Sequence, residues 1–157
     1  MSVTEMHACI DAFTEKECGA GANENDIASA EITLGVQFSE SYRSFLRRVG
    51  WGRFSHQELY GLGVDAPPYL ELVKNTLVER HEMSPALPMH LVPVMNDGAG
   101  NHYCLDTMRL GNGECPVVFW DHEKGSNQTP DVVADSFDFW LVELLAELSQ
   151  PQMPPSS

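Results

Sequence analysis

Residues 91–106, LVPVMNDGAGNHYCLD, and residues 116–120, PVVFW, are the most informative part of the sequence for the architecture. Three apolar segments alternate here with two glycine-rich turns, and this order predicts a β-meander. Because the connections are short, the strands should be antiparallel neighbours. Pro93 has no N–H to donate to a strand ladder, so we expect the first strand to lie at an edge or to carry a bulge. The expected strands are residues 91–95, 102–106 and 116–120.

Helical patterns stand on both sides of the meander. Ser2, Ser39 and Ser136 each precede an apolar pattern of helical period, which is the place of an N-cap. The proline pair at residues 67–68 suits the first turn of a further helix, because proline is preorganised for that position. The expected helices are residues 3–17, 27–34, 40–49, 67–83 and 137–148.

The order of these elements predicts an α+β fold, in which an antiparallel β-meander sheet packs against N-terminal, central and C-terminal helices. Residues 51–63 place short apolar stretches between glycines, which suits short strands or a hairpin. In the central helix the pattern turns Tyr69 inward and Arg80 outward. A length of 157 residues with 43% apolar content suits a single domain. We assign that domain to residues 1–150 and expect the proline-rich residues 151–157 to be a flexible tail.

The chain is strongly acidic, with 23 Asp and Glu against 9 Lys and Arg and a formal net charge of −14. This charge argues against direct binding of nucleic acid or of an anionic membrane, and it permits a basic protein partner. No apolar run approaches the roughly 20 residues that span a bilayer, and the N-terminus lacks a signal-peptide pattern. We therefore expect a cytoplasmic protein whose four cysteines are reduced.

The sequence contains no complete motif for nucleophilic catalysis or for phosphate binding. The one set that could hold a metal ion is His102, Asp106, Asp121 and His122, because strand alternation places the first two on one face of the sheet. The alternative is that these residues are the solvated polar side of an antiparallel sheet. We favour the alternative and expect no metal and no cofactor.

Acidic groups and one aromatic side chain gather at the expected strand ends. Asp97 lies in the first meander turn, and Trp120 is followed directly by Asp121, His122 and Glu123. An aromatic anchor beside charged groups is typical of a protein-binding hot spot. The alternatives are that Trp120 belongs to the core and that the acidity serves solubility alone. We take the four polar residues as candidate partner contacts.

Several segments follow one another in a recognisable order. They are LGV (34–36), YRSFL (42–46), Gly50, LVPV (91–94), NDGAGN (96–101), YCLD (103–106), VVFWDHE (117–123) and SFDFWL (136–141). In this order and spacing the chain resembles the SUKH superfamily, the Smi/Knr-type domain found widely among bacterial immunity proteins. The resemblance covers residues 27–148 and departs at Phe38-Ser39, where the family commonly has Leu-Pro.

The resemblance implies a non-catalytic α+β domain that binds and neutralises a cognate toxin, often a nuclease, delivered between competing bacteria. An acidic surface suits the occlusion of a basic cleft on such a toxin. A second hypothesis is an endogenous regulatory or scaffold module of the same fold with no toxin partner. A third is an enzyme that uses the candidate metal set, because fold alone does not determine function.

Overall fold

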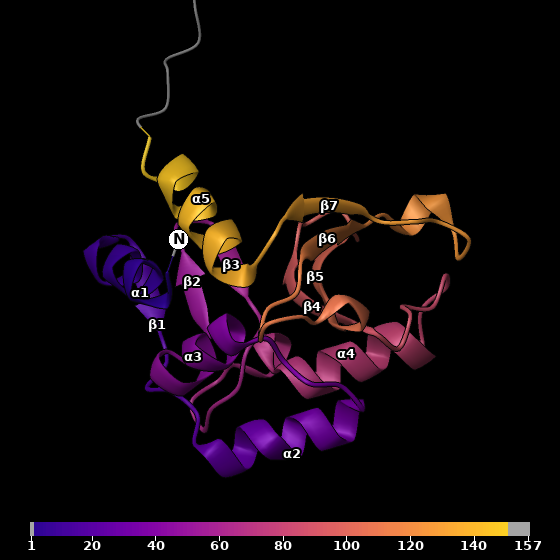
Figure 1. Ribbon diagram of the computed structural model, residues 1–157, viewed down its shortest axis with the longest axis horizontal. Helices are drawn as coiled ribbons and strands as arrows, with labels where there is room; N and C mark the ends of the chain where they lie inside the picture. The colour runs from indigo at the N-terminus through magenta and orange to yellow at the C-terminus, as the bar shows by residue number, and fades with distance from the viewer. Residues whose placement is uncertain (1, 151–157) are drawn as a thin grey trace, which may run out of the picture.

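Residues 2–150 are described in the computed structural model, and they fold as helices around one antiparallel sheet (Figure 1). The sheet has seven strands whose spatial order equals their order in the chain. This arrangement confirms the predicted α+β fold and its meander. The predicted tail, residues 151–157, lies outside the described residues. The strands are β1 (Lys16–Cys18), β2 (Gly52–Phe54), β3 (Gln57–Leu59), β4 (Leu91–Asn96), β5 (His102–Asp106), β6 (Val117–Trp120) and β7 (Asp131–Ala134).

Three helices begin at the predicted serine caps, whereas the second helix begins at Glu24, three residues before its predicted start. The hydroxyl oxygens of Ser2, Ser39 and Ser136 each accept a hydrogen bond from the backbone N–H three residues further on. In Figure 1, α1, α3 and α5 gather at one end of the molecule, and α2 and α4 lie beneath the sheet. Among residues 2–150, no helix has the length and apolarity needed to cross a bilayer. The helices are α1 (Val3–Ala12), α2 (Glu24–Leu34), α3 (Glu40–Arg48), α4 (Leu72–His81) and α5 (Phe137–Leu148).

The first helix is shorter than predicted. It ends at Ala12, because Phe13 adopts an extended backbone and packs edge-on against Phe54 with ring centroids 5.7 Å apart. Residues 16 and 17, which the predicted helix included, instead pair with β2, and together with Cys18 they form the edge strand β1. A tertiary contact thus overrides the local helical pattern.

The central helix begins later than predicted. Pro68–Leu70 form a 3-10 turn, and Glu71 then caps α4 by accepting a hydrogen bond from the backbone N–H of Lys74. The expected inward position of Tyr69 is wrong, since this side chain is 52% exposed. The helix also ends at His81 rather than near Met83.

Arg80, predicted to face solvent, is buried. Its Nη1 donates to the carbonyl oxygen of Leu34 at 2.8 Å and its Nη2 to that of Met89 at 2.7 Å. Leu34 is the last residue of α2, whose terminal carbonyls have no partner within the helix. Arg80 therefore joins α4 to the C-terminal end of α2, and burial lowers its pKa.

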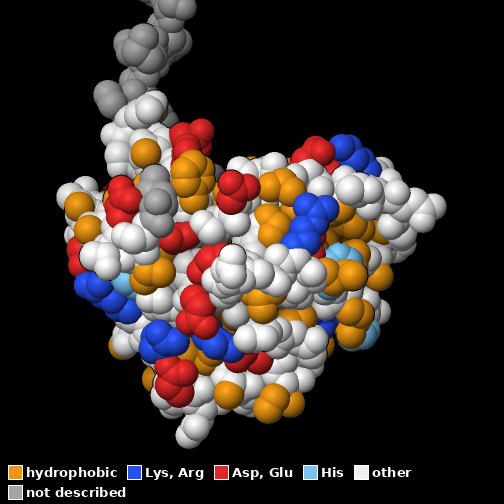
Figure 2. Space-filling model, viewed as in Figure 1, with side chains coloured by type: hydrophobic (Ala, Val, Ile, Leu, Met, Phe, Trp, Pro, Cys, Tyr) orange, Lys and Arg blue, Asp and Glu red, His pale blue; other side chains and the backbone are white. Residues whose placement is uncertain are grey.

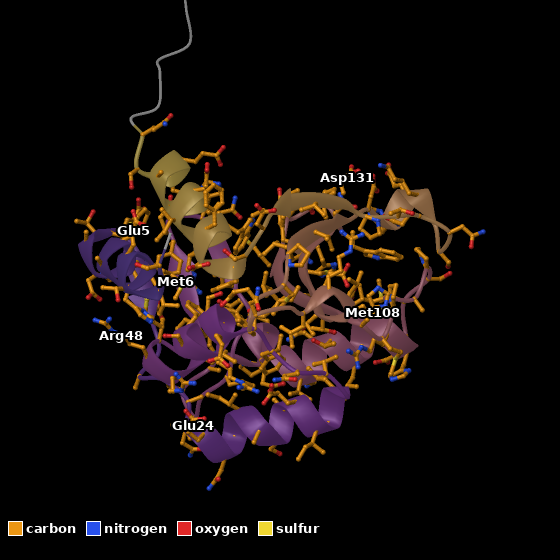
Figure 3. All side chains as sticks on the ribbon, in the orientation of Figure 1. Glu5, Met6, Glu24, Arg48, Met108 and Asp131 are labelled. Carbon is orange, nitrogen blue, oxygen red and sulfur yellow. The ribbon has the colours of Figure 1, made fainter. Side chains whose placement is uncertain are left out.

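The sheet gains an edge strand that the sequence pattern did not indicate. Strand β7 pairs with β6 through Asp131 opposite Phe119 and Val132 opposite Val118, and it forms one outer edge, where Figure 3 labels Asp131. Pro93 lies at an irregularity in the β4–β5 register, so the expected bulge is confirmed. The alternative edge position is wrong, because β4 lies between β3 and β5.

One large core and one small cluster fill the molecule. Tyr42 is at the centre of the large core, where it contacts the rings of Phe38, Phe45 and Phe137. Its hydroxyl donates to the carbonyl oxygen of Tyr60 at 3.1 Å, which satisfies the one polar atom of the buried ring. All four cysteines are free thiols. The small cluster comprises Leu87, Leu91, Cys104, Val118 and Trp120, so the core alternative for Trp120 is confirmed.

Two glycines allow a close approach between two backbone segments. The amide of Leu62 donates to the carbonyl oxygen of Gly50 at 2.9 Å, which holds the segment after β3 against the turn after α3. A Cβ on Gly61 would lie 1.7 Å from that same oxygen. Gly50 itself has φ +82°, a left-handed conformation that glycine adopts without strain. Only glycine fits both positions.

Substitution of Gly61 therefore tests this close approach. We expect Gly61→Ala to lower the free energy of unfolding by about 3 kcal/mol, because the backbone must separate to admit the methyl group. The matched control is Gly111→Ala, where an added Cβ meets nothing within 4 Å, and its stability should change by less than about 0.5 kcal/mol. Urea unfolding of both variants makes the measurement, and equal stabilities would refute the steric account.

Candidate partner-binding surface

The four predicted contact residues lie at one end of the sheet. Strand β4 ends at Asn96, β5 begins at His102 and β6 ends at Trp120, and the register places these three residues side by side. Asp97 follows the first of them, and the segment 121–123 follows the last. The antiparallel meander thus brings together two segments that are more than twenty residues apart in the sequence.

Asp97 organises the turn in which it lies. Its Oδ1 accepts hydrogen bonds from the backbone N–H groups of Ala99 at 2.8 Å and Asn101 at 3.1 Å, and its Oδ2 accepts one from Asn101 Nδ2 at 2.9 Å. Burial by itself raises the pKa of Asp97, but these hydrogen bonds outweigh it and the pKa lies below its usual value. The turn consequently presents a fixed negative charge near neutral pH.

Asn101 connects the Asp97 turn to the other segment. Its Oδ1 accepts from the backbone N–H of His122 at 3.1 Å and lies 2.7 Å from His122 Nδ1. Asp121 accepts from the backbone N–H of Glu123 at 2.9 Å and so caps a single 3-10 turn, residues 122–124. Three of the four candidate contacts therefore also hold this surface in shape, while Glu123 is exposed.

Ion pairs elsewhere in the molecule leave this end of the sheet acidic. Five arginines pair with carboxylates: Arg43 with Glu31 and Glu40, Arg47 with Glu24, Arg48 with Asp11, Arg53 with Glu17 and Glu58, and Arg109 with Asp106. Among the described residues, neither Asp97, Asp121 nor Glu123 has a basic partner within ion-pair distance. We define Asp97, Asp121, His122 and Glu123 as the sheet-end surface.

Two adjoining hollows border the sheet-end surface, and their lining includes residues that the sequence pattern did not single out. Their volumes are about 460 and 620 Å³, and they share Gln57 and Asp97. In the smaller hollow the wall opposite Asp97 belongs to α5 and includes Trp140, Glu143 and Glu147. The two glutamates are four residues apart on an exposed helix face, and this spacing was the only signal in the sequence.

The candidate metal set does not assemble. His102 and Asp106 share a face of β5, but both are buried; Asp106 forms an ion pair with Arg109 and accepts a hydrogen bond from the backbone N–H of Met108. Within residues 2–150, no group of three or more His, Cys, Asp and Glu side chains is placed to hold a metal ion. The expectation that His102 is solvated is also wrong, because α4 covers this face of the sheet and leaves His102 2% exposed.

His102 is enclosed with a second titratable group. Its Nδ1 lies 3.6 Å from Glu79 Oε1 without a hydrogen bond, and its ring stacks on Tyr60 with centroids 6.2 Å apart. Burial lowers the pKa of His102 to about 4. Burial also raises the pKa of Glu79. The imidazole of His102 is therefore neutral where it lies beside Glu79, beneath the sheet-end surface.

These features define an α+β domain whose distinctive surface is acidic and lies at the turn end of a meander. Comparison with known families agrees with this class: residues 6–146 match the SUKH_5 family, described as SMI1-KNR4 cell-wall. The match covers most of the chain, and the protein belongs to this family. SUKH domains are in general toxin-immunity-like domains and are not known as enzymes.

The buried imidazole makes stability depend on pH. The pKa of His102 is about 4 in the folded protein, whereas an unperturbed histidine, as in the unfolded chain, has a pKa of 6.5. As the pH falls, the unfolded chain therefore takes up a proton before the folded protein does. Stability is therefore lost progressively below about pH 6.5, by about 1 kcal/mol between pH 7 and 5.5 from this residue. The raised pKa of Glu79 opposes this trend nearer its own titration range.

We expect His102→Gln to reduce this pH dependence by about 1 kcal/mol over the same interval. A residual slope should remain, because burial also lowers the pKa of His7. The measurement is urea unfolding at the two pH values, with His81→Gln at an exposed position as the control. An unchanged slope in the His102 variant would contradict the assignment.

Proposed function

We propose that this protein is an immunity protein, which binds a cognate bacterial toxin in the cytoplasm and neutralises it by covering its working site. The partner contacts are assigned to the sheet-end surface, with Asp97, Asp121, His122 and Glu123. The toxin is a basic protein, and a nuclease is the class that fits best, because nucleases use Lys and Arg to bind phosphates. The function involves no catalytic residue, no cofactor and no direct contact with nucleic acid or membrane.

One observation carries this proposal: in this member of the SUKH_5 family, carboxylates that have no basic partner in the described part of the chain lie together at a preorganised end of the sheet. The Asp97–Asn101–His122 hydrogen bonds hold this surface before any partner arrives, so little ordering is needed on binding. A net charge of −14 accelerates the encounter with a basic partner. A standard interface of roughly 1,600 Å² would then suffice for tight association.

Co-expression with the toxin encoded in the adjacent reading frame tests the proposed function. We expect the cells to survive and the two proteins to purify as a stable complex. Continued killing without a complex would reject the immunity function. Altered growth on deletion of the gene, with no toxin present, would instead support the regulatory or scaffold hypothesis.

The negative charge of the sheet-end surface can be removed while the backbone hydrogen bonds of its turns are kept. In the triple variant D97N/D121N/E123Q the new amides at positions 97 and 121 each keep an oxygen that can accept the backbone hydrogen bonds of their turns. The hydrogen bond from Asn101 Nδ2 to Asp97 Oδ2 is lost, because an amide has only one acceptor oxygen. We expect the association rate with the toxin to fall about tenfold at low ionic strength, and the difference from wild type to shrink at about 0.5 M salt.

The control for this experiment is E5Q/E15Q/E82Q, which removes the same number of charges at exposed positions that are not part of the sheet-end surface. It should slow association much less, because long-range attraction depends on total charge but contact depends on position. Equal slowing in the two triple variants would show that the sheet-end surface has no particular role.

A further inference from the structure

The smaller hollow described above is an open groove between α5 and the sheet, and we name it the α5 groove. In Figure 2 the molecule is notched between its α5 side and its β7 side, and acidic side chains flank the notch. The α5 groove has a volume of about 460 Å³. Its lining includes Tyr103, Phe139, Trp140 and the carboxylates of Asp97, Glu143 and Glu147.

Aromatic rings form the wall of the α5 groove. The rings of Trp140 and Tyr103 lie 5.6 Å apart between centroids, and Tyr103 packs in turn on Phe119 at 5.1 Å. At the mouth of the groove, Phe139 is 37% exposed and Val133 is 44% exposed, although both are apolar. A ligand that covers these side chains would remove apolar surface from water.

Three carboxylates line the α5 groove, and within residues 2–150 no Lys, Arg or His lines it. Asp97, Glu143 and Glu147 take part in no ion pair among residues 2–150. The two glutamates repel each other, since like charges four residues apart destabilise a helix. Burial raises the pKa of Tyr103, and the negative charges of Asp97 and Glu147 raise it further, so both carboxylates act at this ring.

We propose that the α5 groove binds an arginine side chain presented by a basic segment of a partner protein. The guanidinium group lies against Tyr103 and the exposed ring of Phe139, and its N–H groups donate to the carboxylates of Asp97, Glu143 or Glu147. This inference rests on the proposed function, and it identifies a second contact surface and the chemistry that this surface recognises.

Arginine fits the groove better than lysine does. Its planar guanidinium group stacks on aromatic faces and donates two parallel hydrogen bonds to one carboxylate, whereas the ammonium group of lysine is compact and strongly hydrated. A metal ion is a poor alternative, because no three carboxylates among the described residues converge closely enough to hold one. Asp97 borders both the α5 groove and the sheet-end surface, so one partner can contact both at once.

Binding of a fluorescein-labelled hexa-arginine peptide to the full chain tests the proposal, with fluorescence anisotropy as the measurement. We expect E143Q/E147Q to weaken binding about tenfold relative to wild type. The control variant E5Q/E82Q removes the same charge at exposed positions outside the groove and should weaken binding less than about twofold. Hexa-lysine should bind wild type at least about threefold more weakly than hexa-arginine.

Nuclear magnetic resonance locates the peptide. Amide shifts on addition of hexa-arginine should concentrate at Gln57, Asp97, Tyr103, Glu143 and Glu147. Equal weakening in the two double variants, equal binding of the two peptides, or shifts spread over the whole acidic surface would each overturn the proposal.

Survival assays with the toxin from the adjacent reading frame separate the two proposals. If wild type protects and E143Q/E147Q requires a higher dose of immunity protein than E5Q/E82Q does, the groove contributes to neutralisation. If both double variants protect equally, the α5 groove proposal fails and the immunity function stands. If wild type itself gives no protection, the immunity function fails, and the peptide measurements then decide the groove independently.

Discussion

A chain of aromatic contacts holds α5 against the sheet, and the binding surfaces depend on it. Phe137 at the start of α5 packs on Tyr42 of α3 with ring centroids 4.9 Å apart, and Trp140 one turn later packs on Tyr103 of β5. The buried hydroxyl of Tyr42 is bonded to the segment after β3, so the chain of rings is also tied to the backbone. The large rings of Trp140 and Tyr103 also act as spacers between α5 and the sheet. The helix and the sheet therefore remain separated near Asp97, where the α5 groove is open.

The positions of the acidic residues, and not only their number, define the surface that a partner can recognise. Most arginines face carboxylates on neighbouring helices and strands, where exposed pairs contribute little to stability. At the turn end of the meander, Asp97, Asp121 and Glu123 outnumber Lys124 of the 3-10 turn, so this end is acidic. Antiparallel strands with short connections collect their turns at the two ends of a sheet, and turns tolerate the polar residues that recognition needs. The carboxylate of Asp97 stabilises its turn by hydrogen bonds and also supplies negative charge to two adjoining surfaces.

The sheet is covered more completely than an antiparallel meander requires. Helix α4 covers the face that includes His102, so polar residues that alternate along β5 are enclosed rather than hydrated. This explains why His102 remains neutral beside Glu79 and why Arg80 donates to the carbonyl oxygens of Leu34 and Met89 instead of reaching water. The prediction of a solvated polar face failed here, because burial depends on which helix returns over the sheet.

Local patterns in the sequence determined the meander, the bulge at Pro93, the three serine caps and the gathering of Asp97 with residues 121–123, because each follows from the chemistry of a short segment or of a tight turn. Tertiary contacts alone decided the edge strands β1 and β7, the burial of Arg80 and His102, and the α5 groove. Glu143 and Glu147 illustrate the difference. Their exposure follows from helical period, but their position opposite Asp97 arises only when distant rings pack, and no local pattern encodes that distance.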